Sequence, residues 1–127
     1  MLALLLVDDD DLVRDATAAS LKERGYEVCT AANGHEALEH LHRAARVDAV
    51  ILDILMPVMD GIETLRAIRA SWPNLPVVVV SGGFRSGWAD ALAMAAKLGA
   101  TRTLSKPFVP RDLIKVLEAA LAEARPG

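Results

Sequence analysis

Five side chains that could take part in chemistry come at the ends of apolar segments: Asp8, Asp9, Asp53, Ser81 and Lys106. Carboxylates that share a pocket repel one another and raise each other's pKa unless a cation lies between them. A hard divalent cation with oxygen ligands, most naturally Mg²⁺, would relieve that repulsion. A lysine supplies positive charge for an anion, and a serine hydroxyl supplies a hydrogen-bond donor. The set therefore fits phosphoryl transfer with a carboxylate as nucleophile.

Asp53 lies within a continuous apolar run, 50–56, that Pro57 closes. Such a run predicts a strand buried on both faces, in the middle of a parallel sheet. Open α/β sheets place their ligand crevices at the carboxyl ends of such strands, where Asp53 is expected. A buried, unpaired carboxylate is costly, so Asp53 needs a cation or a site that uses its charge. The alternative is that Asp53 only ends the strand and caps the following turn.

Strand-like segments alternate with helical patterns along the whole chain. We expect strands over 2–7, 26–31, 49–53, 76–81 and 101–105, and helices over 12–24, 34–46, 60–71, 86–98 and 110–124. Asp10 or Asp11 is expected to cap the first helix, and Gly25 to end it. The alternation predicts an α/β fold: a doubly wound, five-stranded parallel sheet with helices on both faces.

Composition limits the class of protein. A chain of 127 residues predicts one domain, and no run approaches the ~18 apolar residues of a membrane span. The apolar start lacks a basic flank and ends in aspartates, which indicates a strand and not a signal peptide. The single cysteine, Cys29, excludes an internal disulfide and fits a reducing cytoplasm. Residues 1–63 carry 5 basic and 13 acidic side chains, whereas residues 64–127 carry 9 and 4. The pI of about 5.5 argues against nucleic-acid binding.

Several short motifs recur in the order and spacing of a known family: Leu6-Val7-Asp8-Asp9-Asp10, Leu52-Asp53-Ile54-Leu55-Met56-Pro57, Met59-Asp60-Gly61, Ser81 after the valine run, and Lys106-Pro107-Phe108. The sequence resembles the receiver domain of bacterial response regulators in two-component signalling, over essentially the whole chain. The resemblance implies a flavodoxin-like strand order, 2-1-3-4-5, in a stand-alone, cytoplasmic receiver domain spanning residues 1–127.

The resemblance also implies a role for each motif residue. Asp53 would be the phosphoacceptor. Mg²⁺ would be held by Asp8, Asp9, Asp53 and the backbone carbonyl of Leu55, with Asp8 acting through water. The phosphoryl oxygens would be bound by Ser81, Gly82 and Lys106, and the Lys106-Pro107 bond would be cis. The domain would be a phosphoacceptor regulatory domain and not an enzyme. It would promote the phosphorylation and dephosphorylation of its own aspartate.

The implied partners are a sensor histidine kinase or a histidine phosphotransfer protein, and downstream a protein partner or a second receiver. No direct nucleic-acid or membrane contact is expected. Where the family usually has an aromatic switch residue, this chain has Thr103, so backbone movement of Gly82-Gly83 and of the helix bearing Trp88 should carry the response. We expect the changed surface to include Arg85, Trp88, Arg102 and Thr103.

Two alternative functions and two other sequence features bear on this interpretation. The alternatives are a docking module of the same fold without phosphorylation, and a small aspartyl-phosphate phosphatase, which usually has an acid/base aspartate where this chain has Leu55. The three histidines, His35, His40 and His42, cannot all point one way on a helix, which argues against a metal site. Cys29 is expected to be a small core residue.

Overall fold

A parallel five-stranded sheet forms the centre of the computed structural model. The structure describes residues 1–44, 46–54, 58–82 and 88–124. For residues 58–60, 82, 88–91 and 124 it describes the backbone alone. Its strands are β1 (Ala3–Val7), β2 (Glu27–Ala31), β3 (Ala49–Asp53), β4 (Val77–Gly82) and β5 (Arg102–Lys106). They lie in the order β2-β1-β3-β4-β5, and every neighbouring pair is parallel. The predicted fold class and strand order are confirmed.

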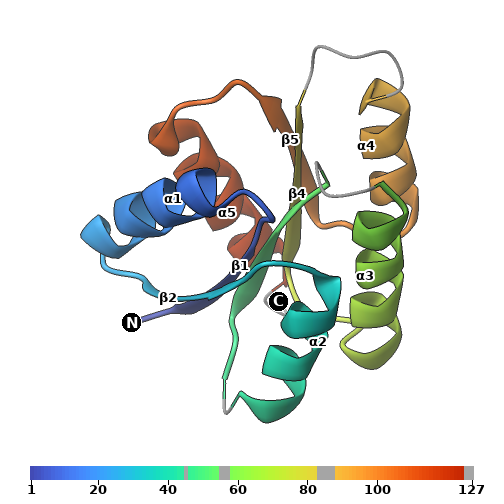
Figure 1. Cartoon of the computed structure of the whole chain (residues 1–127), viewed down its shortest axis with the longest axis horizontal. Helices are drawn as coiled ribbons and strands as arrows, with labels where there is room; N and C mark the ends of the chain where they lie inside the picture. Colours follow the sequence, from blue (N-terminus) through green and yellow to red (C-terminus); the bar gives the residue numbers. More distant parts are fainter. Residues whose placement is uncertain (45, 55–57, 83–87, 125–127) are drawn as a thin grey trace.

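Helices cover both faces of the sheet (Figure 1). Two of them, α1 (Asp11–Glu23) and α5 (Pro110–Ala124), pack on one face. The other three, α2 (Gly34–Arg43), α3 (Val58–Ser71) and α4 (Trp88–Lys97), pack on the opposite face. Parallel strands need crossover connections, and helices are what supply them here. No helix in the described part of the chain has both the length and the apolar character needed to cross a membrane.

Alternation along the strands divides the core into two layers. On β1, Leu5 and Val7 pack toward α2, α3 and α4, whereas Leu4 and Leu6 pack toward α1 and α5. Side chains point to opposite faces at successive strand residues, so a strand covered on both faces must be apolar throughout. All five residues of β3 are buried. Asp53 is therefore carried by a strand that is buried throughout, as its apolar run predicts.

The helix ends differ from expectation at two places. The second helix, α2, ends at Arg43 and not near Arg46, whose guanidinium instead donates to Asp48 Oδ2 at 2.9 Å. The third helix, α3, begins at Val58, ahead of its predicted start at the Asp60-Gly61 pair. Gly61 serves close packing: a Cβ there would lie 2.9 Å from Ile54 Cγ1. The glycine thus marks a tight contact inside the helix, not its beginning.

Capping of α1 follows the sequence. Of the two candidates, Asp10 is the N-cap, and its Oδ1 accepts from the backbone N–H groups of Leu12 at 3.0 Å and Val13 at 3.1 Å. Gly25 follows the other end of α1 with φ +92°, a conformation that favours glycine. The helix is thereby fixed directly after the acidic segment that leads into it.

Polar contacts fasten the amino ends of the strands. Asp48 Oδ2 accepts from Ala3 N at 2.7 Å, which joins the start of β1 to the segment before β3. Arg69 donates from Nη2 to Gly99 O at 2.6 Å and from Nη1 to Leu75 O at 2.7 Å, which joins α3 to the segments before β4 and β5. The side chains with candidate chemistry lie at the other end of the sheet.

Candidate functional site

The carboxylate of Asp53 and the ammonium of Lys106 meet at the carboxyl end of the sheet. Lys106 Nζ lies 2.8 Å from Asp53 Oδ2, and Asp53 is only 1% exposed. These residues end β3 and β5, which are separated by β4, so the lysine side chain spans the end of β4. A charge withdrawn from water needs a partner of opposite sign, and Lys106 supplies it. The peptide bond between Lys106 and Pro107 is cis.

Asp8 brings a second carboxyl group to Asp53. It follows β1, is 4% exposed, and is hydrogen-bonded to the Asp53 carboxyl group. Burial raises the pKa of Asp8 to about 6, the N–H of Asp10 opposes the rise, and the negative charge of Asp53 adds to it. That N–H donates to Asp8 Oδ1 at 2.9 Å. Two carboxyl groups in contact, one with a raised pKa, form a donor set that suits a hard cation.

The remaining predicted metal ligands are not gathered in the same way. Asp9 follows Asp8, but its side chain is exposed. Leu55 lies outside the described residues. Within the described ranges, no three His, Cys, Asp or Glu side chains form a group able to hold a metal ion. The structure thus brings together Asp8, Asp53 and Lys106, with Asp9 adjacent in sequence only.

Ser81 is completely buried on β4, and its Oγ has no hydrogen-bond partner among the described residues. In the sheet register, Val80 is opposite Asp53 and Gly82 is opposite Lys106, so Ser81 lies on the strand between the two charged residues. A buried hydroxyl without a partner costs about 1–3 kcal/mol. A ligand oxygen at this end of β4 would give the hydroxyl a partner.

Arg14 also contacts the candidate site, although the sequence pattern did not indicate it. Its side chain is 15% exposed; Nη1 donates to the backbone oxygen of Asp8 at 2.8 Å, and Nη2 donates to Asp11 Oδ1 at 2.6 Å. A signal was available, since Arg14 lies near the amino end of α1, where the helix dipole disfavours a cation. A cation placed against the helix dipole needs compensating hydrogen bonds or ion pairs, which Asp8 and Asp11 supply here.

Cys29 is exposed, so the expectation of a core residue is wrong. It belongs to β2, an edge strand that has a neighbour on one side only. Beside it a cavity of about 350 Å³, lined also by His40 and Arg46, gives the thiol access to solvent. The strand predicted over 26–31 is therefore present as β2, but Cys29 is not buried in it. His35 pairs with Glu39 at 3.0 Å, in keeping with a solvated helix face.

The predicted partner surface is described only in part. Thr103 on β5 is half-buried, and Arg102 is exposed with its Nε 2.6 Å from Glu123 Oε2 on α5. Arg85 lies outside the described residues, as does the side chain of Trp88. Lys106 at the carboxyl end of β5 and the predicted surface residues Arg102 and Thr103 thus lie on different stretches of the strand.

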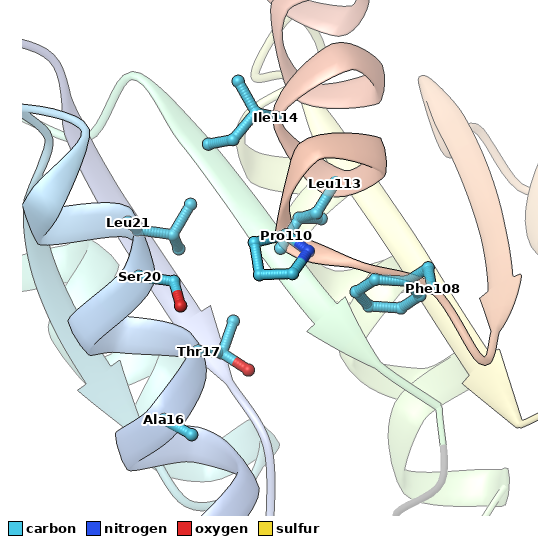
Figure 2. A pocket seen from close by; sticks show the side chains of 8 residues that line it. All are labelled: Ala16, Thr17, Ser20, Leu21, Phe108, Pro110, Leu113 and Ile114. Carbon is cyan, nitrogen blue, oxygen red and sulfur yellow. The ribbon is translucent and has the colours of Figure 1, made fainter.

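A separate cavity of about 150 Å³ lies between α1 and the start of α5 (Figure 2). Figure 2 shows Thr17 and Ser20 of α1 facing Phe108 and Pro110 across it. None of its lining side chains carries a charge. The cavity is therefore distinct from the charged cluster at the strand ends.

Comparison with known proteins gives a consistent result. The family model described as "Response regulator receiver domain" matches residues 4–118. The response regulator MprA of Mycolicibacterium vanbaalenii is 37% identical over 123 residues, which are 97% of this chain and 52% of that protein. The chain thus spans about half the length of the curated relatives it matches.

Solved structures agree. The receiver domain of NtrX from Brucella abortus is 36% identical with a TM-score of 0.84, over 94% of this chain and 98% of that one. A response regulator receiver domain protein from Clostridium thermocellum is 29% identical with a TM-score of 0.87, over 97% and 96%.

Proposed function

Because the chain belongs to the family of response regulator receiver domains, we propose that it accepts a phosphoryl group on Asp53. The donor is a phosphohistidine on a sensor histidine kinase or a histidine phosphotransfer protein. The observation that carries the proposal is the buried Asp53 carboxylate, held 2.8 Å from Lys106 and in contact with Asp8. The three side chains come from the ends of three strands, which is where open α/β sheets bind ligands.

In the transfer step, a carboxylate oxygen of Asp53 attacks the phosphorus atom. An O–P bond forms as the P–N bond to histidine breaks, and the electron pair stays on the ring nitrogen, which takes up a proton from solvent. Lys106 offsets the negative charge of the phosphoryl oxygens. The Ser81 hydroxyl, buried and without a hydrogen-bond partner among the described residues, donates to one of those oxygens, and the backbone N–H of Gly82 donates to another. This chain therefore positions and neutralises the transferred group.

Mg²⁺ fits the same set of residues. Asp8 and Asp53 are carboxyl groups in contact, so two negative charges accumulate there when both ionise. Asp8, Asp9, Asp53 and the backbone carbonyl of Leu55 would hold the ion, which would supply positive charge to the phosphoryl oxygens. Asp9 has an exposed side chain that can turn toward Asp8 without breaking a core contact.

Phosphorylation then changes a protein-binding surface. We place residues 1–127 in a single receiver unit that works in the cytoplasm and that contacts neither nucleic acid nor membrane directly. A downstream protein or a second receiver reads the surface of Arg85, Trp88, Arg102 and Thr103. Thr103 is β-branched and short, so it cannot move a large side chain, and the backbone after β4 carries the change.

The test treats the protein with acetyl phosphate and Mg²⁺ and weighs it intact. Wild type should gain one phosphoryl group, and Asp53→Asn should gain none. Asp15→Asn, which alters an exposed carboxylate on α1, should match wild type. An adduct of similar yield on Asp53→Asn would refute the assignment.

A further inference from the structure

The segment between β1 and α1 is held by its own side chains. Asp8 N donates to Ala31 O at 3.1 Å, and Asp10 N donates to Asp8 Oδ1 at 2.9 Å. Arg14 closes the segment from the helix: its backbone N–H donates to Asp10 O at 2.8 Å, and its guanidinium donates to Asp8 O at 2.8 Å. The main chain of Asp8 is therefore bonded through both its N–H and its carbonyl.

We propose that Arg14 is a positioning residue that fixes the acidic segment after β1 for binding a divalent cation. The inference rests on the proposed function, since it assigns a role in the same site. Arg14 does not touch the phosphoacceptor; it acts through the backbone of Asp8 and the carboxylate of Asp11. Its planar fork can bond both oxygens at once, which a single ammonium group cannot do as well.

The positioning role and the positive charge of Arg14 predict opposite changes in Mg²⁺ affinity when the side chain is removed. Arg14 is a cation close to the acidic segment, so Coulomb repulsion alone would make its removal tighten Mg²⁺ binding. Loss of positioning would weaken binding, because groups that orient metal ligands typically change affinity by about 10- to 100-fold when removed. The sign of the change therefore separates the two effects.

The location of Arg14 supports positioning. Its side chain is 15% exposed, and it lies near the amino end of α1, where a cation opposes the helix dipole. The bonds to Asp8 O at 2.8 Å and Asp11 Oδ1 at 2.6 Å offset that disadvantage. Arg43 provides a contrast, because it is 81% exposed on α2 and lies 3.5 Å from Glu39.

The experiment measures Mg²⁺ affinity from amide chemical shifts in wild type, Arg14→Gln, Arg14→Lys and, as a control, Arg43→Gln. We expect Arg14→Gln to weaken affinity by about tenfold, Arg14→Lys to recover part of the loss, and Arg43→Gln to match wild type. Hydrogen exchange at the Asp10 amide should be faster in Arg14→Gln than in wild type, and it should be unchanged in the control Arg43→Gln. Unchanged or tighter Mg²⁺ binding by Arg14→Gln would overturn the inference and leave the proposed function intact.

Two further outcomes are decisive. If Arg14→Gln does not fold, Arg14→Lys alone decides, and an affinity equal to that of wild type overturns the inference. If wild type itself shows no Mg²⁺-dependent shifts, the metal site of the proposed function fails and the inference fails with it.

Discussion

The buried hydroxyl of Ser81 links stability to function at a single residue. Its Oγ has no partner among the described residues, so it costs free energy of folding in the unphosphorylated protein. We expect Ser81→Ala to raise the free energy of unfolding in urea by about 1 kcal/mol. The same change should weaken binding of the phosphate mimic beryllofluoride in the presence of Mg²⁺, because one donor is lost.

The control for Ser81 lies opposite it in the sheet. Ser105 pairs with Ser81 in register on β5, but its side chain is exposed. Ser105→Ala should therefore change neither stability nor mimic binding appreciably. A Ser81→Ala protein that is less stable than wild type would contradict this account of the hydroxyl.

Asp8 makes stability depend on pH. Its pKa is raised from 3.8 to about 6, mainly by burial. The folded state therefore binds this proton more tightly than the unfolded state does, so the contribution is fully present below pH 3.8 and is lost as the pH rises through about 6. Mg²⁺ binds the ionised form, so its stabilising effect should grow across the same interval.

Thermal melts with Mg²⁺ and with EDTA, at pH 5 and at pH 7.5, measure this dependence. The rise in Tm due to Mg²⁺ should be larger at pH 7.5, and Asp8→Asn should reduce it. Asp15→Asn, on an exposed part of α1, serves as the control. An Mg²⁺ effect of equal size at both pH values would count against Asp8 as a ligand.

At the scale of elements, the start of α2 depends on contact with α3. A Cβ added at Gly34 would collide with Thr64 Oγ1, and Thr64 is buried. Alanine in a helix is ordinarily better than glycine by about 1 kcal/mol. Here we expect Gly34→Ala to destabilise by about 1–3 kcal/mol, because the two helices must separate.

A double-mutant cycle tests the contact between Gly34 and Thr64. Gly34→Ala should cost less in a Thr64→Ala background, since the colliding hydroxyl is then absent. Urea unfolding of the four proteins gives the coupling free energy. Additive effects would mean that α2 and α3 do not meet at these residues.

The sequence predicts elements well and contacts between them less well. Apolar runs identify β1, β3 and β4 because these strands are covered on both faces, and the polar residues at their carboxyl ends belong to the candidate site. The expected burial of Cys29 is wrong, because neither the residue type nor the pattern over 26–31 distinguishes an edge strand from a central one. It also misreads Gly61, whose packing against Ile54 depends on tertiary structure.

The residues of the candidate site can be predicted from the sequence, but the contacts among them cannot. Asp8 follows β1, whereas Asp53 and Lys106 end β3 and β5, and parallel topology alone brings these strand ends together. Neither the bond from Arg14 to the Asp8 carbonyl nor the lack of a partner for Ser81 Oγ within the described ranges can be derived from spacing. Both depend on the distances between side chains after folding.

At the scale of the whole molecule, the two ends of the sheet differ in chemistry. The amino ends carry closed polar contacts, such as Asp48 to Ala3 N and Arg69 to Gly99 O. In the described part of the chain, the carboxyl ends carry the Asp8–Asp53 carboxyl pair, Lys106 and the hydroxyl of Ser81, which has no hydrogen-bond partner there. A firmly bonded end and a reactive end on one rigid sheet allow a site to change charge while the fold is kept.

The exposure of Cys29 makes this protein convenient for spectroscopy. It is the only cysteine of the chain and lies on β2, at the opposite edge of the sheet from β5. A maleimide fluorophore or a nitroxide spin label would therefore attach at one defined position without any substitution. With a second label introduced on β5, resonance energy transfer or dipolar spectroscopy would measure the width of the sheet before and after treatment with acetyl phosphate, from a reference strand that carries none of the proposed site residues.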